Sequence, residues 1–301
     1  MRILHIDSSH SIEVFKALAN EHRLEMLKIL SKGPKNINEL SEILNIPFST
    51  AALHIKKLEE AELIKTQIVP GRGSQKVSYN RYERVVVDLE ESADAEKQII
   101  IEREVGEFFN CEIEPTCGLL SEHGVIHMND DPRSFYEIDS RNAQLIWFRS
   151  GHLEYHYPNR IPDKSSVKEI SFSLEICSEA PYHRAEWPSD ITCWINGQEI
   201  GFWVSPGDFG GKRGFLTPSW WSINNTQFGI LTTWTVNHEG SFINDQKISD
   251  VTIAHLGLLD KPFISYQIGI KKESINQGGV NLFGSKFGNH AQGIIMKVLL
   301  E

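Results

Sequence analysis

No stretch of eighteen or more apolar residues occurs in this sequence of 301 residues, so it predicts no helix long enough to cross a membrane. Residues 1–7 also lack the long apolar segment of a secretory signal. We therefore expect a soluble, cytoplasmic protein. The length is typical of two domains, or of one small and one large domain.

Cysteine is sparse as well. The sequence has four cysteines, and their irregular spacing does not suit a disulfide framework in a chain of this length. We expect them to be reduced and mostly buried. One alternative stays open, in which Cys111 and Cys117 bind a metal with His123 and His127. The gap of five residues between these cysteines is not the spacing of a zinc knuckle, so we predict no metal site.

Basic charge is scarce overall but concentrated in one segment. The net charge is −10, yet residues 1–91 contain 13 Lys or Arg and 13 Asp or Glu, so all excess acid lies beyond them. Between residues 45 and 82, six basic residues stand against three acidic ones. Exposed charges are screened beyond about 10 Å in 0.1 M salt. A local basic surface can therefore bind nucleic acid despite the acidic total.

Apolar residues recur every three to four positions in residues 12–30, which predicts two amphipathic helices. Gly33 and Pro34 end the second helix. A short third helix follows, where Asn36 or Asn38 can cap free backbone amides. Pro47 then suits the first turn of a fourth helix, because its missing N–H costs nothing there.

The fourth helix has the composition of a recognition helix. One face is apolar and consists of Ala51, Ala52, Ile55 and Leu58. Two β-like stretches follow at 65–69 and 76–89, separated by a glycine-rich turn that carries Arg72. This order of elements is that of a winged helix-turn-helix, whose second helix enters the major groove of DNA while the wing follows the backbone.

The candidate DNA-binding residues lie on the polar faces of the fourth helix and on the wing. Those of the helix are expected to reach base edges or flanking phosphates, and those of the wing to neutralise backbone charge. They are Ser49, Thr50, His54, Lys56, Lys57, Arg72, Ser74 and Lys76.

Residues 15–27 (FKALANEHRLEML) and 49–64 (STAALHIKKLEEAELI) resemble the opening and the recognition helix of ArsR-type transcription regulators. The resemblance covers residues 11–90. It implies a homodimeric, repressor-like regulator that binds double-stranded DNA. ArsR-type metal sensors typically carry a cysteine motif in the helix before recognition, whereas residues 39–43 contain no cysteine. Metal sensing at that position is therefore not expected.

Beyond residue 98 the sequence consists of short β-rich runs separated by turns rich in Gly, Asn and Pro, with no periodic segment of helix length. Many short strands with long connections predict a β-sandwich of the jelly-roll type. The predicted fold is thus α+β and multidomain: a winged helix at 1–90, a linker at 91–98 and an all-β sandwich at 99–301.

All seven tryptophans lie after residue 140. Trp220 and Trp221 follow a long predicted loop, and at least one of them is expected to be exposed, because adjacent strand residues face opposite ways. Segments 170–176 and 191–200 resemble galactose-binding-like or carbohydrate-binding jelly rolls, which implies a small carbohydrate effector. Such a ligand needs aromatic faces beside polar groups. The candidates are His183, Arg184, Glu186, Asp208, Arg213, Trp220, Trp221 and Asn225.

The common catalytic motifs are missing: no G-x-S-x-G, H-E-x-x-H, P-loop or dinucleotide fingerprint occurs. We therefore expect neither an enzyme nor a cofactor. Two alternatives stay open. The first is a module that binds protein in place of DNA. The second is a carbohydrate-active enzyme, with a carboxylate pair drawn from Glu179, Glu186, Asp190 and Asp208.

Overall fold

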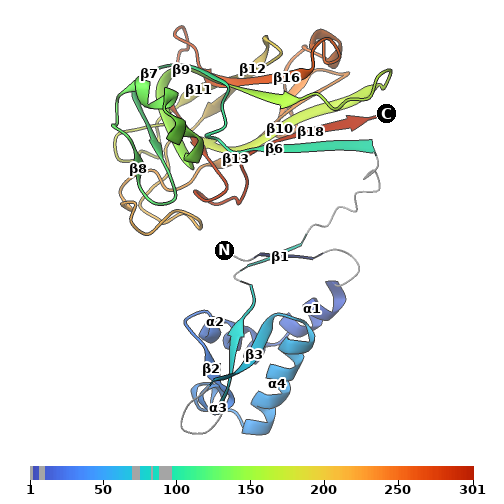
Figure 1. The fold of residues 1–301 in the computed structure, drawn as a ribbon, viewed down its shortest axis with the longest axis vertical. Helices are drawn as coiled ribbons and strands as arrows, with labels where there is room; N and C mark the ends of the chain where they lie inside the picture. The colour runs from blue at the N-terminus through green and yellow to red at the C-terminus, as the bar shows by residue number, and fades with distance from the viewer. Residues whose placement is uncertain (1–2, 7–10, 70–74, 83, 88–96) are drawn as a thin grey trace. The chain divides into compact units, whose positions relative to one another are not determined.

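The computed structural model describes residues 3–6, 11–69, 75–82, 84–87 and 97–301. The chain forms two compact units, Met1–Ala93 and Asp94–Glu301 (Figure 1). Each unit is described by itself. The sequence-based boundaries, with a linker at 91–98, stay a prediction, because most of that linker lies outside the described residues.

Four helices form the described α-helical part of the first unit: α1 (Ser11–Leu18), α2 (Glu21–Leu30), α3 (Ile37–Leu44) and α4 (Phe48–Glu60). Asn20 caps α2 by accepting a hydrogen bond from the backbone N–H of Arg23. Asn36 and Glu39 form a reciprocal capping box at the start of α3. Asn45, in a left-handed conformation, ends α3. The helices predicted from apolar spacing are therefore all present, and Asn36 is the cap of the third.

Two small sheets complete this unit. β2 (Lys35–Asn36), β4 (Gln75–Asn80) and β3 (Ile64–Val69) form an antiparallel sheet in that order. β3 and β4 are the predicted wing strands, but the second ends at Asn80 and not at residue 89. The chain instead forms β5 (Arg84–Val87), which pairs in parallel with β1 (Ile3–Ile6). The sequence pattern does not predict the strand at residues 3–6.

The apolar stripes of the helices meet in one core. Met26, Leu40, Ala51 and Leu58 are fully buried there, and Ile64 joins them from β3. Burial of one large aliphatic side chain stabilises a fold by about 1.5–3 kcal/mol. This core fixes which side of α4 remains available for contact with a partner.

The second unit is a sandwich of 13 strands. They are β6 (Gln98–Arg103), β7 (Asn110–Leu120), β8 (Val125–Ile126), β9 (Leu145–Pro158), β10 (Val167–Cys177), β11 (Ser189–Ile195), β12 (Gln198–Ser205), β13 (Ile230–Asn237), β14 (Ser241–Ile243), β15 (Gln246–Ser249), β16 (Phe263–Ile270), β17 (Val280–Phe283) and β18 (Ile294–Leu300).

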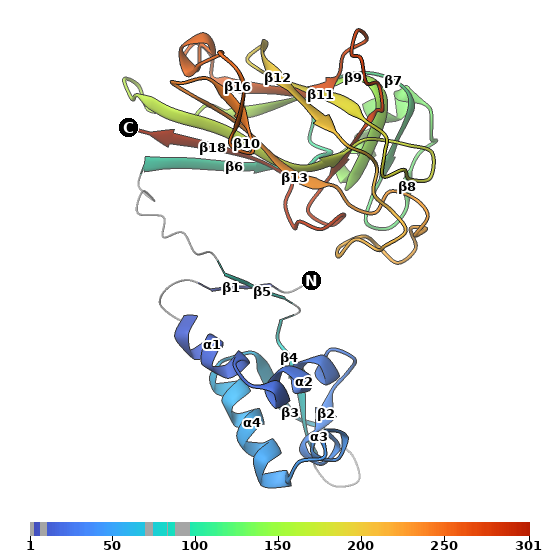
Figure 2. The same cartoon turned by 180° about the vertical axis from the view of Figure 1, so that it is seen from behind.

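Two layers enclose the core of this unit (Figures 1 and 2). One layer has the order β12-β11-β16-β9-β7-β8, and the other has the order β6-β18-β10-β13-β14-β15. β17 pairs both with the first half of β9 and with the end of β10, so it joins the layers and makes the sandwich nearly a barrel. Tyr155, Phe172, Trp234 and Tyr266 are fully buried between the layers. The predicted fold class, a winged helix followed by an all-β sandwich, is confirmed.

Strand register gathers four long connections at one end of the sandwich. Leu120 pairs with Leu145, Ile176 with Ile230, and Ser189 with Ser205. The end of β10 also pairs with β17. The loops that leave from these positions are residues 121–144, 178–188, 206–229 and 284–293. Every candidate ligand-binding residue from the sequence analysis lies in one of them.

Among the described residues, no helix has the length and apolar character needed to cross a bilayer. All four cysteines are free and buried, as predicted. Within the same residues, no three His, Cys, Asp or Glu side chains come together as a metal-binding group. Cys111, Cys117, His123 and His127 therefore do not assemble the alternative metal site.

Candidate DNA-binding surface and ligand pockets

α4 has one buried face and one exposed face. The buried residues Ala51, His54, Ile55 and Leu58 follow the spacing of one helical stripe. Opposite them, Ser49, Lys56 and Lys57 are exposed, and Thr50 is half-buried. The exposed side therefore carries hydroxyl and ammonium groups, which are the groups that contact base edges and phosphates.

The lysine candidates of this unit are available for contact. Lys57 forms an ion pair with Glu60 at 2.9 Å, and Lys56 lies 3.9 Å from the same carboxylate. Exposed pairs of this kind contribute only a few tenths of a kcal/mol, so a phosphate can replace Glu60 as the partner. Lys76 is exposed on β4. Arg72 and Ser74 lie outside the described residues.

His54 has to be removed from the residues expected to read bases. Its side chain is 8% exposed, and its ring lies 5.7 Å from that of His22. The Nδ1 atom is buried and has no hydrogen-bond partner among the described residues. His54 falls on the apolar stripe three residues after Ala51, so the helix turns it into the domain.

Leu53 and Phe48 are two further candidate DNA-contact residues, which the sequence pattern did not indicate. Both are 55% exposed on α4, beside Ser49 and Lys56. An exposed apolar side chain on a recognition helix can contact the methyl group of thymine in the major groove. Their apolar character concealed them, because apolar residues in a helix are most often taken for core.

The buried position of His54 predicts a pH dependence of the first unit. Burial, and then the nearby charges of Arg23 and His22, lower the pKa of His54 from its ordinary 6.5. The folded unit therefore binds fewer protons than the unfolded chain once the pH falls below 6.5. We expect the free energy of unfolding to decrease from that pH downward, until the folded pKa is passed. The variant His54→Leu should lack this component.

Circular dichroism at the helical band tests this expectation, because the described α-helices all belong to the first unit. Thermal unfolding of the full chain is followed from about pH 7.5 to about pH 5. If wild type and His54→Leu lose the same stability over this range, the buried imidazole is not the cause.

The structure brings two of the eight ligand candidates together in one cavity. Trp221 and Asn225 line a cavity of about 170 Å³ at the loop end of the sandwich. Four further side chains with suitable chemistry line it, and of these the sequence had indicated only Glu179, as a carboxylate of the enzymatic alternative. They are Trp147, Glu179, Tyr182 and Asn281. We call this cavity the aromatic pocket.

The aromatic pocket combines three aromatic rings with a carboxylate and two amides. Burial raises the pKa of Glu179, although the Thr116 hydroxyl donates a hydrogen bond to it at 3.1 Å. Trp221 is held in place because its indole N–H donates to the carbonyl of Thr226 at 2.8 Å. Such a site offers apolar faces and directed hydrogen bonds to one small hydroxylated molecule.

Asp208 is not available to a ligand and has to be withdrawn. Its side chain is 0% exposed. One carboxylate oxygen accepts hydrogen bonds from the backbone N–H of Ala180 and the hydroxyl of Thr226. Burial raises its pKa to about 7, against the lowering effect of these two donors. Asp208 therefore fixes the loops that surround the aromatic pocket.

The other candidates make local contacts outside the aromatic pocket. Arg213 donates to the carbonyls of Pro218 and Trp221, and the Arg184 guanidinium lies 4.7 Å above the ring of Trp187. The ring of His183 hydrogen-bonds the carbonyl of Asn224, and Glu186 is exposed. Trp220 is 41% exposed, so the prediction that one tryptophan of the pair is exposed is confirmed.

The carboxylates of the enzymatic alternative do not share a described cavity. Asp190 is buried and accepts hydrogen bonds from the backbone and the side chain of Asn276. Only Glu179 of the four lines the aromatic pocket.

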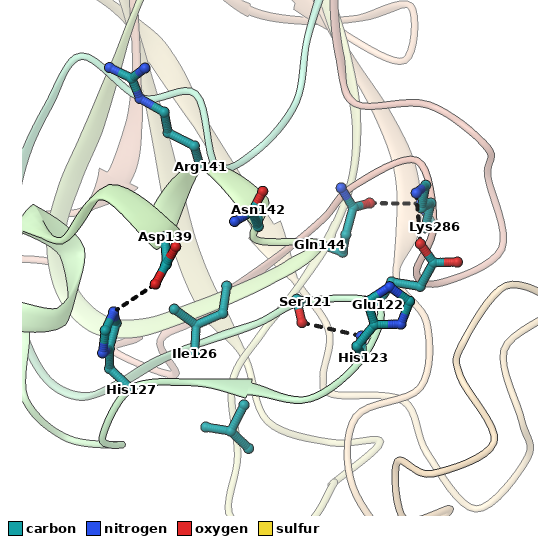
Figure 3. A pocket seen from close by; sticks show the side chains of 11 residues that line it. Ser121, Glu122, His123, Ile126, His127, Asp139, Arg141, Asn142, Gln144 and Lys286 are labelled. Carbon is teal, nitrogen blue, oxygen red and sulfur yellow. Dashed lines mark hydrogen bonds and ion pairs between the residues drawn. The ribbon is translucent and has the colours of Figure 1, made fainter.

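A second and larger pocket of about 570 Å³ lies at the same end of the sandwich (Figure 3). Residues 121–127, the 3₁₀ helix Ile138–Asn142, Gln144 and Lys286 supply its walls. We call it the polar pocket, because its lining side chains are polar or charged apart from Val125 and Ile126, and none carries a phenyl, phenol or indole ring. No ligand candidate had been placed in it from the sequence.

Part of the helical unit is similar to known regulatory proteins. Residues 20–66 match the model of bacterial regulatory proteins of the arsR family. Over 58 residues the chain is 38% identical to an uncharacterized HTH-type transcriptional regulator of Methanocaldococcus jannaschii, and this stretch covers 19% of the chain and 61% of that relative. The chain thus spans less than two-thirds of the curated relative that it matches.

Two solved structures are similar to separate parts of the chain. One is the homodimeric winged helix-turn-helix DNA-binding domain of a possible ArsR-family regulator from Mycobacterium bovis, with 23% identity, a TM-score of 0.23, and coverage of 25% of this chain and 66% of that one. The other is the CBM36-1 domain of a multidomain xylanase from the hindgut metagenome of Trinervitermes trinervoides. It has 8% identity, a TM-score of 0.28, and coverage of 67% of this chain and 95% of that one.

Proposed function

We propose that this chain, which carries an ArsR-family helix-turn-helix at residues 20–66, is a transcription regulator that binds double-stranded DNA. The observation that carries the proposal is the exposed face of α4, where hydroxyl, ammonium and apolar groups stand opposite a fully packed core. The proposal implies a soluble protein of the cytoplasm.

The proposed contact set of the helix is Ser49, Thr50, Leu53, Lys56 and Lys57. Ser49 and Leu53 would read base edges, and the two lysines would bind phosphates. Lys76 on β4 would add a backbone contact from the wing, together with Arg72 and Ser74 as the sequence predicts.

A homodimer is proposed for this unit. Ile12 is 63% exposed and Phe15 44% exposed on α1, while Val14 and Ala17 of the same helix are buried. Two apolar side chains on the outer face of a short helix favour coverage by a second copy of the chain. A two-fold dimer would place two α4 helices on half-sites about 34 Å apart.

The effector proposed for the sandwich is a small carbohydrate bound in the aromatic pocket. The support is the combination of Trp147, Tyr182 and Trp221 with Glu179 and the two amides. Binding there would repress or release transcription only if the ligand prefers one arrangement of the dimer.

Binding to DNA is tested by gel mobility shift of the full chain with the DNA upstream of its own coding region, against unrelated DNA of the same length. We expect a retained complex with the first DNA at concentrations that leave the second free. Capture of a protein partner with no DNA retardation would favour the alternative of a protein-binding module.

Loss of the Tyr182 ring is expected to weaken sugar binding. Tyr182 is 75% exposed, so Tyr182→Ala leaves the core intact. An aromatic contact contributes about 0.5–1.5 kcal/mol, which corresponds to an affinity weaker by about two- to twelvefold. Thermal shift with mono- and oligosaccharides measures it, since a ligand at 100 times its dissociation constant adds about 2.7 kcal/mol to stability.

The control is Phe109→Ala, which removes another exposed ring of the same unit outside the aromatic pocket. No thermal shift of the wild type with any sugar would remove the carbohydrate proposal. An equal shift in wild type and Tyr182→Ala would place the sugar elsewhere.

A further inference from the structure

Besides the aromatic pocket, the structure assigns a second ligand site: we propose that the polar pocket binds a small polyhydroxylated anion. Its volume of about 570 Å³ lies within the range of small-molecule sites. Ten of its eleven lining residues belong to the connection 121–144, and Lys286 comes from the connection 284–293, so two connections at this end of the sandwich form it.

Two pairs of an acidic and a basic side chain lie at opposite sides of this pocket (Figure 3). Lys286 Nζ lies 2.6 Å from Glu122, and this contact lowers the pKa of Glu122 and raises that of Lys286. His127 Nε2 lies 3.7 Å from Asp139. Both carboxylates keep free acceptor positions, because a carboxylate accepts at up to four lone pairs.

Three of the remaining lining side chains carry hydrogen-bond donors that are available to a ligand. The side chains of Arg141 and Asn142 make no hydrogen bond or ion pair with another described residue, and the ring of His123 makes no hydrogen bond with one. Arg141 is always protonated and offers five N–H groups. The Gln144 amide is already used, since its oxygen accepts from the Lys286 backbone N–H and its nitrogen donates to Glu104. Arg141 is therefore a lining cation with no ion-pair partner among the described residues, and its guanidinium fits a carboxylate or a phosphate.

The carboxylates narrow the ligand further. Glu122 and Asp139 can only accept hydrogen bonds, so a bound anion must bring hydroxyl donors of its own. The pocket has no phenyl, phenol or indole ring for stacking, unlike the aromatic pocket. A sugar acid or a sugar phosphate has both an anionic group and several hydroxyl donors. A neutral sugar lacks the anionic group, and inorganic phosphate lacks the sugar hydroxyls.

Trp220 provides an internal reporter. Its indole N–H donates to the carbonyl of Glu122 at 2.8 Å, and the next residue, Trp221, lines the aromatic pocket. A ligand that displaces Glu122 or its partner Lys286 would therefore change the environment of an emitting side chain at the rim of the polar pocket.

The experiment titrates the full chain with glucuronate, glucose 6-phosphate, glucose and inorganic phosphate at millimolar concentrations, followed by calorimetry and tryptophan emission. We expect glucuronate or glucose 6-phosphate to bind at least about tenfold more tightly than glucose and inorganic phosphate. The tighter of the two identifies the anionic group. Arg141→Gln should weaken that binding about tenfold, because the unpaired charge is lost.

Arg149→Gln is the matched control, since Arg149 is an exposed arginine of the same unit outside the pocket. Binding that is equal in wild type and Arg141→Gln, or no binding of any of the four probes, overturns the proposal. Binding of glucose that is as tight as that of both glucuronate and glucose 6-phosphate overturns the anionic assignment. The test does not depend on the DNA-binding proposal. The variant Tyr182→Ala distinguishes the polar pocket from the aromatic pocket, because it should bind the anion as tightly as the wild type.

Discussion

Replacement of both Lys56 and Lys57 by alanine is expected to lower the affinity for every DNA sequence and to reduce the salt dependence of binding by about two units of slope. Each lysine that neutralises a phosphate releases about 0.9 counterions on B-DNA. Both side chains are exposed on α4, so the core of the unit is unaffected. The measurement is the slope of log affinity against log salt concentration, from fluorescence anisotropy of labelled DNA.

The matched control is the double variant Lys28→Ala with Lys32→Ala, which removes two exposed lysines at the end of α2 and beyond it. It should retain the slope of the wild type. A double variant of α4 with an unchanged slope would mean that this helix does not contact the DNA backbone.

The second large effect is expected from Glu175→Ala in the sandwich. Glu175 is 0% exposed, and its carboxylate accepts backbone hydrogen bonds from Gly229, Asn289 and His290 at 2.7–2.9 Å. The Gly229 bond is buried and the other two are partly buried. A buried donor that loses its partner costs about 1–3 kcal/mol, so the variant should lose at least about 1–3 kcal/mol of unfolding free energy. Urea unfolding followed by tryptophan emission measures it, because all seven tryptophans belong to this unit.

Glu169→Ala serves as the comparison, since Glu169 lies on the same strand and is only half-buried. We expect a change within about 0.5 kcal/mol for that variant. Similar small losses in both variants would show that the three backbone groups find water or other partners when Glu175 is removed.

Helix periodicity gave the first unit almost completely, because its core is built from residues close in sequence. The errors occurred where the spacing of apolar residues did not show whether a side chain on α4 faces the core or the solvent. His54 and Leu53 are neighbours on α4, and side-chain polarity alone placed the histidine outside and left the leucine unconsidered. The structure places them the other way round, because the stripe of Ala51 and Leu58 includes position 54.

The ligand pockets were harder to predict, because each is assembled from segments far apart in the chain. Trp147 on β9, Glu179 after β10 and Asn281 on β17 meet only through the register of β17 with both neighbours. The loop that carries Trp221 was found from its glycine-rich composition. Asp208 in the same loop was assigned to a ligand, since a sequence does not show that Ala180 and Thr226 would bury and bind it.

Selection of binding sites from a random pool of DNA by the full chain tests the central claim most directly. If α4 of a homodimer reads DNA, the selected sequences share a pseudo-palindrome whose half-sites lie about one helical turn, or a multiple of it, apart. The Lys56→Ala, Lys57→Ala variant should select the same pattern with weaker retention, because the two lysines are proposed to bind phosphates. A pool that stays random through selection with the wild-type chain would contradict the assignment of this protein as a sequence-specific DNA-binding regulator.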